Sequence, residues 1–129
     1  APLCAVETVN PKMPPTMDAD ALTKMSEAGE LPGCEVFGPL SMDLAIDEEA
    51  AVHKGVSNPV AGHADVLLFP DIDAGNITYK TLVRTAKVKN GNVLIGTSAP
   101  VVLTSRSDDF ETKLYSIALA AVIAGSITN

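Results

Sequence analysis

The fold of this 129-residue chain is decided by the stretch Asp65–Asn76, which reads DVLLFPDIDAGN. Its first five residues are mostly apolar and of strand length, and Pro70 closes the run because proline has no N–H for a β-ladder. A polar loop of residues 71–75 follows, and Asn76 is a suitable N-cap for a helix predicted over Ile77–Lys87. The stretch therefore predicts a buried strand, a loop and a helix in succession.

Strands and helices alternate in the same way on both sides of this stretch. Further strands are predicted over Leu3–Val6, Cys34–Phe37, Val93–Ile95 and Val101–Leu103. Further helices are predicted from Thr16 or Asp18 to Ala28, and over Asp43–His53 and Asp108–Ala124. Strands that alternate with helices of about ten residues or more imply βαβ crossovers. The predicted fold class is therefore α/β: a three-layer sandwich with a mostly parallel sheet and helices on both faces.

The spacing of apolar residues along the predicted helices indicates which side chains face the core. The residues expected to face inward are Leu22, Met25, Leu44, Ala51, Val52, Leu114, Ile117, Ala118 and Ala121. The chain has only two cysteines, Cys4 and Cys34, and both lie beside apolar residues. We therefore expect them to be buried free thiols and not members of a disulfide framework.

Composition and charge narrow the class of protein. The chain is 47% hydrophobic and 19% charged, and its length favours a single α/β unit over residues 1–129. Nine basic and sixteen acidic residues give a formal net charge of −7, which argues against a nucleic-acid partner. The longest apolar run, Ile117–Gly125, is far shorter than the ~20 residues of a membrane-spanning helix. We expect no membrane partner and a cytoplasmic location.

A candidate anion site lies between the last predicted strand and the last predicted helix. Arg106, one of two arginines in the chain, is flanked by the hydroxyl residues Thr104, Ser105 and Ser107. A fixed guanidinium, hydroxyl donors and the N–H groups of a helix start suit phosphate or carboxylate oxygens. An equally weighted alternative is a plain strand-to-helix turn with a capping serine and a surface arginine. The acidic pair that follows, Asp108 and Asp109, also fits a purely structural helix start.

The loop before the predicted Asn76 cap offers two further candidates. Gly75 permits close backbone approach by a ligand, so Gly75 and Asn76 are candidate substrate-binding residues. Asp71 and Asp73 could hold a divalent metal, but such a pair is more often a polar turn with side chain-to-backbone hydrogen bonds. We therefore predict no metal site.

Several motifs of the chain closely resemble those of the phosphate acetyl/butyryl transferase family. Residues 60–71 read VAGHADVLLFPD and residues 75–80 read GNITYK, which gives the joined pattern Pro-Asp-x-x-x-Gly-Asn-x-x-Tyr-Lys. The segments GPLSMD at 38–43 and TSR at 104–106 also match. The opening AVETVNPKMP at 5–14 resembles the phosphate butyryltransferase branch in particular. The resemblance extends from about Leu3 to Ala124.

This resemblance implies a fold and a reaction. Family members are about twice as long, with two α/β domains of isocitrate dehydrogenase-like architecture that flank an active-site cleft. The chain would match the second domain and the closing helix, and its partners would be an amino-terminal domain of the same enzyme and further copies in a homo-oligomer. The reaction is transfer of an acyl group, butyryl or acetyl, between coenzyme A and phosphate. Coenzyme A is a substrate there, and no other cofactor is expected.

The resemblance also assigns roles to individual residues. Ser105 would donate a hydrogen bond near the carbonyl and the thiol, and Arg106 would bind phosphate. Arg84 matches another arginine of the family that helps to bind the anionic substrate. Thr104, Gly75 and Asn76 complete the set of predicted substrate-binding residues.

One departure from the family pattern concerns the general base. Acetyltransferase members carry an aspartate seven residues after the motif serine, and that position is Thr112 here. Asp108 and Asp109 lie four and three residues earlier on the predicted helix, so either could assist thiol deprotonation, or phosphate itself could take the proton. The alternative functions are a non-catalytic module that binds coenzyme A or an anion, and a distant metal-dependent dehydrogenase.

Overall fold

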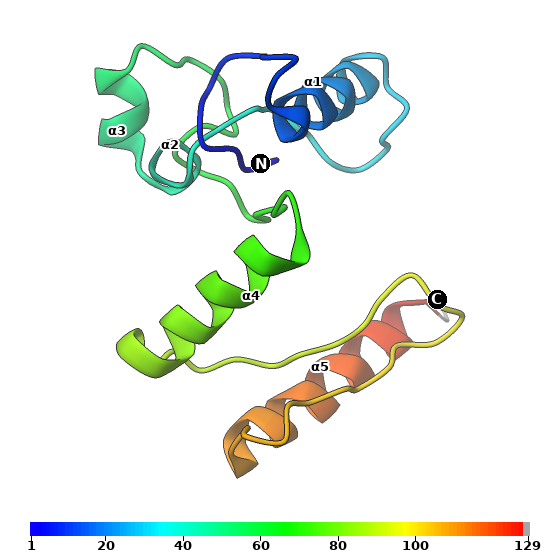
Figure 1. The fold of residues 1–129 in the computed structure, drawn as a ribbon. Helices are drawn as coiled ribbons and strands as arrows, with labels where there is room; N and C mark the ends of the chain where they lie inside the picture. The colour runs from blue at the N-terminus through cyan, green and yellow to red at the C-terminus, as the bar shows by residue number, and fades with distance from the viewer. Residues whose placement is uncertain (128–129) are drawn as a thin grey trace. The chain divides into compact units, whose positions relative to one another are not determined.

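The computed structural model describes residues 1–127 and divides the chain into two compact units. Unit 1 comprises Ala1–Asn76, and unit 2 begins at Ile77. The helices labelled in Figure 1 are α1 (Pro14–Glu27), α2 (Met42–Ile46), α3 (Glu48–His53), α4 (Ile72–Thr81) and α5 (Phe110–Ile127). The π-helix η1 (Leu82–Ala86) follows α4 directly. The helix α4 crosses the boundary between the units, and α5 lies wholly in unit 2.

Three segments of unit 1, around Leu3, Leu40 and Leu68, meet in parallel register. Pro2 pairs with Leu68 and Leu3 pairs with Leu40, so the first residues lie between the two other segments. The Leu3 N–H donates to Leu68 O at 2.8 Å, and the Cys4 N–H donates to Leu40 O at 2.8 Å. The parallel pairing was predicted, but on one side it falls at Leu40, three residues beyond the expected strand Cys34–Phe37.

The three-layer sandwich is not confirmed, because backbone pairing among the described residues amounts to three single bridges. Prolines explain why the pairing in unit 1 does not lengthen into a ladder. Pro2, Pro39 and Pro70 each lack an N–H, and each lies at or within two residues of a bridging position. The third bridge joins Leu94 and Val101 in antiparallel register, so the last two predicted strands form a hairpin instead of extending a parallel sheet.

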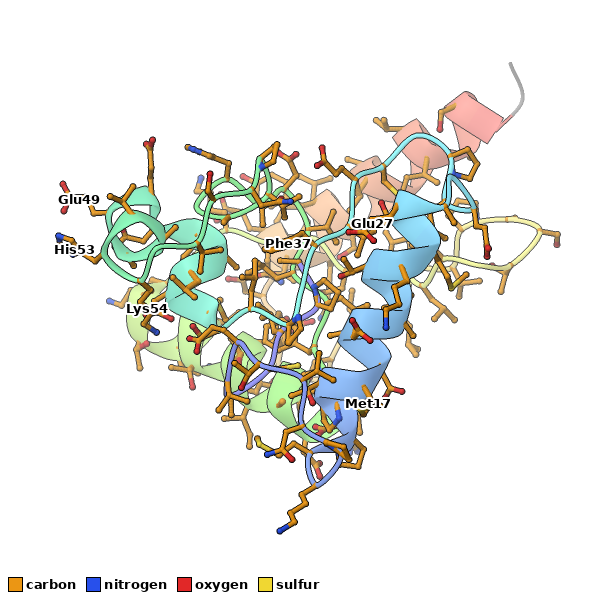
Figure 2. All side chains as sticks on the ribbon, turned by 90° about the horizontal axis from the view of Figure 1, so that it is seen from above. Met17, Glu27, Phe37, Glu49, His53 and Lys54 are labelled. Carbon is orange, nitrogen blue, oxygen red and sulfur yellow. The ribbon has the colours of Figure 1, made fainter. Side chains whose placement is uncertain are left out.

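The core of unit 1 is apolar and forms around α2 and α3. Its buried members are Leu3, Leu40, Leu44, Ala45, Ala51 and Ala61. The prediction is confirmed for Leu44 and Ala51 and is wrong for Val52, which is 68% exposed. The predicted helix 43–53 breaks at Asp47, whose extended backbone ends α2 and whose carboxylate accepts the N–H of Glu49 at 2.9 Å. The break turns Val52 away from the core. Figure 2 shows the outer side of α3, where Glu49 and His53 lie.

The helix α1 packs through a polar stripe. Its buried residues are Thr16, Ala19 and Thr23, whereas the predicted inward residue Met25 is exposed. Thr23 Oγ1 accepts the Gly38 N–H at 2.9 Å, so its hydroxyl satisfies loop backbone that an apolar side chain would leave unpaired. Met17 is also exposed and is labelled on α1 in Figure 2.

The helix α5 does not bury the side chains that were predicted to face inward. The side chains of Thr112, Ser116 and Ala120 are buried, while all four predicted inward residues, Leu114, Ile117, Ala118 and Ala121, are exposed. The cause is the segment 90–92, which lies so near α5 that a Cβ at Gly91 would come 3.0 Å from the carbonyl of Tyr115. Such close approach needs small or hydroxyl-bearing residues on the contacting face of the helix.

Two further expectations concern cysteines and membranes. Cys34 is exposed and Cys4 is half-buried, so the prediction of two buried thiols is wrong. Cys34 follows the Pro32-Gly33 turn and lies outside the apolar core. Within residues 1–127, no helix has both the length and the apolar character needed to cross a bilayer.

Candidate functional site

The predicted catalytic residues of unit 2 lie in one tight turn before α5. The Ser105 N–H donates to Asp108 Oδ2 at 2.7 Å, and the Asp108 N–H donates to Ser105 O at 3.1 Å. The hydroxyls of Ser105 and Ser107 lie 3.1 Å apart. Thr104 and Ser105 are half-buried and Arg106 is exposed. The turn is therefore held from within by the Asp108 carboxylate, which leaves the Arg106 side chain outside this network.

Asp109 has a structural part at the start of α5. Its Oδ1 accepts the Thr112 N–H at 2.8 Å, which satisfies one of the unpaired donors of the first helical turn. This backbone hydrogen bond, followed by that of the Thr112 side chain, lowers the pKa of Asp109 from its ordinary value. A carboxylate held in this way is a weaker proton acceptor than an ordinary aspartate.

Arg84 and the turn share a groove of about 320 Å³ within unit 2. The groove is lined by Arg84, Lys87, Lys89, Asn90, Ser107, Asp108, Asp109, Glu111, Thr112 and Tyr115, together with Val83 and Val88. Lys89 is paired with Glu111 at 3.2 Å, whereas within the described residues Arg84 and Lys87 form no ion pair. Two unpaired cations thus face a groove whose carboxylates at 108 and 109 are engaged by backbone N–H groups.

The predicted site residues are brought together only in part. Thr104, Ser105, Arg106 and Asp108 lie in one turn, and Asp108 lines the same groove as Arg84. Arg106 is not one of the residues that line this groove. The two arginines therefore do not line this groove together: Arg84 lines it and Arg106 does not.

Gly75 and Asn76 lie inside α4 and not at its entrance. The helix begins at Ile72, and Asp71 Oδ1 accepts the Ala74 N–H at 2.8 Å, so the predicted cap at Asn76 is wrong. Asp71 is as good an N-cap as asparagine, and it comes first in the chain. A Cβ at Gly75 would lie 3.6 Å from Phe69 Cβ, an ordinary contact. Within residues 1–127, no group of three or more histidine, cysteine, aspartate or glutamate side chains could hold a metal ion.

A polar cluster next to the turn was not predicted as functional. Asn90 Nδ2 and Asn92 Nδ2 both donate to the Tyr79 phenol oxygen, each at 3.1 Å. The Asn92 N–H donates to Ser116 Oγ at 2.8 Å. The signal in the sequence was the pair of asparagines around Gly91, which by itself predicts only a turn. We name Tyr79, Asn90, Asn92, Thr112 and Ser116 the asparagine cluster.

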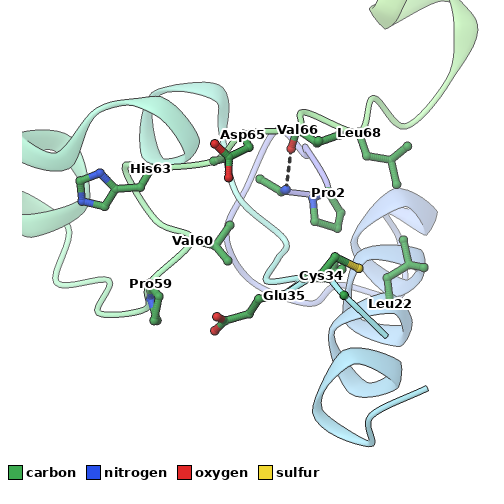
Figure 3. Close-up of a pocket in the computed structure, with 14 residues that line it drawn as sticks. Pro2, Leu22, Cys34, Glu35, Pro59, Val60, His63, Asp65, Val66 and Leu68 are labelled. Carbon is green, nitrogen blue, oxygen red and sulfur yellow. Dashed lines mark hydrogen bonds between the residues drawn. The ribbon is translucent and has the colours of Figure 1, made fainter. Parts of the chain in front are cut away.

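Unit 1 contains a larger cavity of about 650 Å³, shown in Figure 3. Its walls are mostly apolar and include Leu22, Val36, Val60 and Leu68. The Ala1 amine donates to Val66 O at 2.8 Å at its edge. None of the predicted site residues lines it, so it does not contribute to the candidate site.

Comparisons with known proteins give a consistent result. The family model described as phosphate acetyl/butaryl transferase matches residues 1–121. The chain is 61% identical over 126 residues to a phosphate butyryltransferase of Clostridium acetobutylicum, covering 98% of this chain and 42% of the relative. It is 56% identical over 120 residues to a phosphate acetyltransferase of Thermotoga maritima, covering 93% of this chain and 41% of the relative.

A solved structure is similar as well. The crystal structure of a branched-chain phosphotransacylase from Enterococcus faecalis V583 superimposes with a TM-score of 0.81 at 45% sequence identity. The match covers 93% of this chain and 43% of that chain. The fold described above is thus that of a known phosphotransacylase over the matched residues, and the chain spans less than half the length of the relatives it matches.

Proposed function

Because the chain belongs to the phosphate acetyl/butyryl transferase family, we propose that it is part of a phosphate acyltransferase. The reaction is acyl-coenzyme A plus phosphate to acyl phosphate plus coenzyme A, with butyryl or acetyl as the acyl group. Within that enzyme, the chain corresponds to the second domain and the closing helix, at the carboxyl-terminal side. Coenzyme A is a substrate in this scheme, and the proposal includes no other cofactor.

The observation that carries this proposal is the position of Arg84. Its guanidinium has no ion-pair partner among the described residues, and it lines the groove that Ser107 and Asp108 of the turn also line. A guanidinium is suited to bidentate contact with phosphate oxygens. An unpaired arginine beside a serine-rich turn supports binding of a multiply charged phosphate group at this place.

The chemistry follows from which bonds change. In one direction the thiolate sulfur of coenzyme A attacks the acyl carbonyl carbon, a C–S bond forms, and the C–O bond to phosphate breaks. The oxyanion of the tetrahedral intermediate needs hydrogen-bond donors, and the departing phosphate needs positive charge. Ser105 supplies the hydroxyl donor, Arg106 and Arg84 supply the charge, and Thr104, Gly75 and Asn76 contribute to substrate binding. In the other direction phosphate attacks the thioester and the thiol leaves.

The structure favours Asp108 over Asp109 as the group that assists thiol deprotonation. Asp109 caps α5 and its pKa is lowered, which makes its carboxylate a weak base. Asp108 lines the groove and accepts a hydrogen bond from the Ser105 backbone. Phosphate itself remains the third candidate acceptor for the thiol proton.

The exposed apolar face of α5 supports a partner domain. Leu114, Ile117 and Val122 are exposed on this helix, and Ile117 has 60% of its surface accessible. Apolar side chains gathered in this way mark a surface that another protein surface covers. We assign it to the amino-terminal domain of the same enzyme, with further copies of the enzyme forming a homo-oligomer.

The test is a transfer assay on the enzyme that contains this chain. We expect release of coenzyme A from butyryl- or acetyl-coenzyme A only when phosphate is present. Asp108→Asn should lower kcat by about 10²-fold. Asp109→Asn keeps a side-chain oxygen for the Thr112 N–H and should leave kcat nearly unchanged. Near-normal turnover in both variants would show that neither carboxylate deprotonates the thiol. Binding of coenzyme A without any transfer would contradict the proposal and favour a non-catalytic module.

A further inference from the structure

Tyr79 belongs to the GNITYK motif and is not one of the predicted substrate-binding residues. It lies on α4 and is half-buried, and its phenol oxygen accepts hydrogen bonds from two amide groups, Asn90 Nδ2 and Asn92 Nδ2, each at 3.1 Å. One oxygen therefore fixes both asparagines on either side of Gly91. A phenylalanine would fill the same space without this acceptor, and both amide groups would lose their common partner.

The two asparagines are also fastened to α5. The Asn92 N–H donates to Ser116 Oγ at 2.8 Å, and that hydroxyl in turn donates to Thr112 O at 2.7 Å. Thr112 Oγ1 approaches Asn90 Oδ1 at 3.4 Å. Ser116 is completely buried, so its hydroxyl has no water to replace these partners. The asparagine cluster thus ties α4 to the first two turns of α5.

The cluster reaches the catalytic turn at one atom. Asn92 Nδ2 lies 3.5 Å from Asp108 Oδ2, and the same oxygen receives the Ser105 N–H at 2.7 Å. Asp108 therefore stands between the cluster on one side and the Ser105 backbone on the other. A shift of the Asn92 amide changes the surroundings of the oxygen that holds this turn closed.

We propose that Tyr79 and Asn92 are positioning residues, which hold Asp108 and through it the Ser105–Arg106 turn in the geometry for transfer. This inference rests on the proposed acyltransferase function. Catalytic groups need placement to within a fraction of an ångström, and a misplacement of about 1 Å can cost about 10²-fold in rate. Neither Tyr79 nor Asn92 lines the groove, so each acts through Asp108 and not on the substrate.

A purely structural role makes different predictions. A simple strut between α4 and α5 would affect stability and leave kcat of the folded enzyme unchanged. Positioning residues lower kcat more than they change KM for phosphate, and they act as one unit. Two substitutions in such a unit are not additive, because the first already releases what the second holds.

The experiment combines kinetics and amide hydrogen exchange in the enzyme that contains this chain. Tyr79→Phe and Asn92→Ala should each lower kcat about tenfold, with a smaller change in KM for phosphate. The double variant should lose no more than the worse single variant. Exchange at the Ser105 amide should accelerate in both, since its acceptor Asp108 becomes mobile. Tyr115→Phe is the matched control for exchange, because it removes a hydroxyl that contacts Lys89 and Glu111 outside the cluster.

Each outcome decides the inference. Unchanged kcat together with unchanged Ser105 exchange in Tyr79→Phe overturns it, as do additive losses in the double variant. A fall in thermal stability with normal kcat in the folded variants also overturns it and shows that the cluster only connects α4 to α5. If the wild-type enzyme transfers no acyl group, the proposed function fails. The exchange response at Ser105, compared with the Tyr115→Phe control, then still decides whether the cluster holds the turn.

Discussion

The two units of this chain are stabilised in different ways. Unit 1 has eight buried hydrophobic residues, namely Leu3, Ala19, Leu40, Leu44, Ala45, Ala51, Val60 and Ala61. In the described part of unit 2 the corresponding group is Ala120 alone, beside the buried hydroxyl residues Thr112 and Ser116. Unit 1 thus combines a group of buried apolar side chains with the buried hydroxyl residues Thr16 and Thr23. The described part of unit 2 lacks such an apolar group and rests mainly on hydrogen bonds between loop and helix.

This contrast bears on where the proposed catalytic turn lies and how firmly its atoms are held. Apolar burial is non-directional and tolerates small shifts, whereas a hydrogen-bonded cluster fixes particular atoms relative to one another. The proposed catalytic turn lies beside the second kind of packing, and its carboxylate at 108 is reached by Asn92. The same contrast leaves large apolar side chains of α5 exposed, including Leu119 and Val122, because its inner face is polar.

The largest effect is expected in the core of unit 1. Leu44 is fully buried, and Leu44→Ala should reduce the free energy of unfolding by about 2–5 kcal/mol through lost burial and a cavity. Denaturant unfolding measures it. The matched control is Val52→Ala on the neighbouring helix α3, which should change stability by less than about 0.5 kcal/mol because Val52 is exposed. Equal losses in the two variants would mean that the apolar core is not centred on α2.

The next effect concerns activity and not stability. Arg106→Ala in the enzyme that contains this chain should lower kcat by about 10²-fold, the scale of losing one charge-stabilising donor. Its unfolding free energy should stay unchanged, because Arg106 is exposed and has no hydrogen bond or ion pair within residues 1–127. Arg106→Lys keeps the charge without the planar fork and should be intermediate. A normal rate with normal phosphate affinity would make Arg106 a surface residue of a plain turn.

These contrasts also explain what the sequence could predict. The segments around Leu3 and Leu68 were predicted as strands because apolar runs between turn residues indicate burial, and they do pair in parallel. Leu44 and Ala51 were found by helical spacing. Thr16, Thr23 and Ser116 were missed because apolar periodicity assigns hydroxyl residues to the outer face, while their burial depends on loop groups distant in sequence.

The start of α4 illustrates a second reason why the sequence alone did not predict some features of the structure. Asp71 and Asn76 are equally good caps, and the residues between them fit either a loop or a helical turn. Only the structure shows that the Ala74 N–H is bonded to Asp71, which moves the helix start to Ile72. The partners of Asn90 and Asn92 likewise depend on the approach of Tyr79 from another helix, which no local pattern contains.

A smaller effect tests the polar packing of unit 2. Ser116→Ala removes the acceptor of the Asn92 N–H and should cost about 1–3 kcal/mol, the range for a buried group left without its partner. Ser126→Ala is the matched control on the same helix, since Ser126 is exposed and, within the described residues, its hydroxyl donates to Ile123 O alone. We expect a near-zero change in its free energy of unfolding. A stable Ser116→Ala variant would show that unit 2 does not depend on these hydrogen bonds.

The smallest expected effect is a change in how stability depends on pH and salt when a carboxylate of either unit is replaced. Lys54 and the Ser41 hydroxyl bond Glu7 and lower its pKa below the ordinary 4.5, so its contribution to stability is complete above that value and is lost as pH falls through the lowered pKa. Glu7→Gln should therefore lower stability near neutral pH and converge with the parent in acid. Glu30→Gln, an exposed control, should follow the parent throughout.

Added salt then distinguishes a carboxylate held by an ion pair from one held by a backbone hydrogen bond. The Glu7–Lys54 pair is partly exposed, so added salt should shrink the difference between Glu7→Gln and the parent. In unit 2 the lowered pKa of Asp109 comes first from the Thr112 backbone N–H, a hydrogen bond that salt screens much less. The acid-sensitive stability lost in Asp109→Asn should therefore persist at high salt. Equal salt sensitivity of the two variants would mean that the carboxylates of both units are held by long-range charge, and the contrast between the units would not extend to their electrostatics.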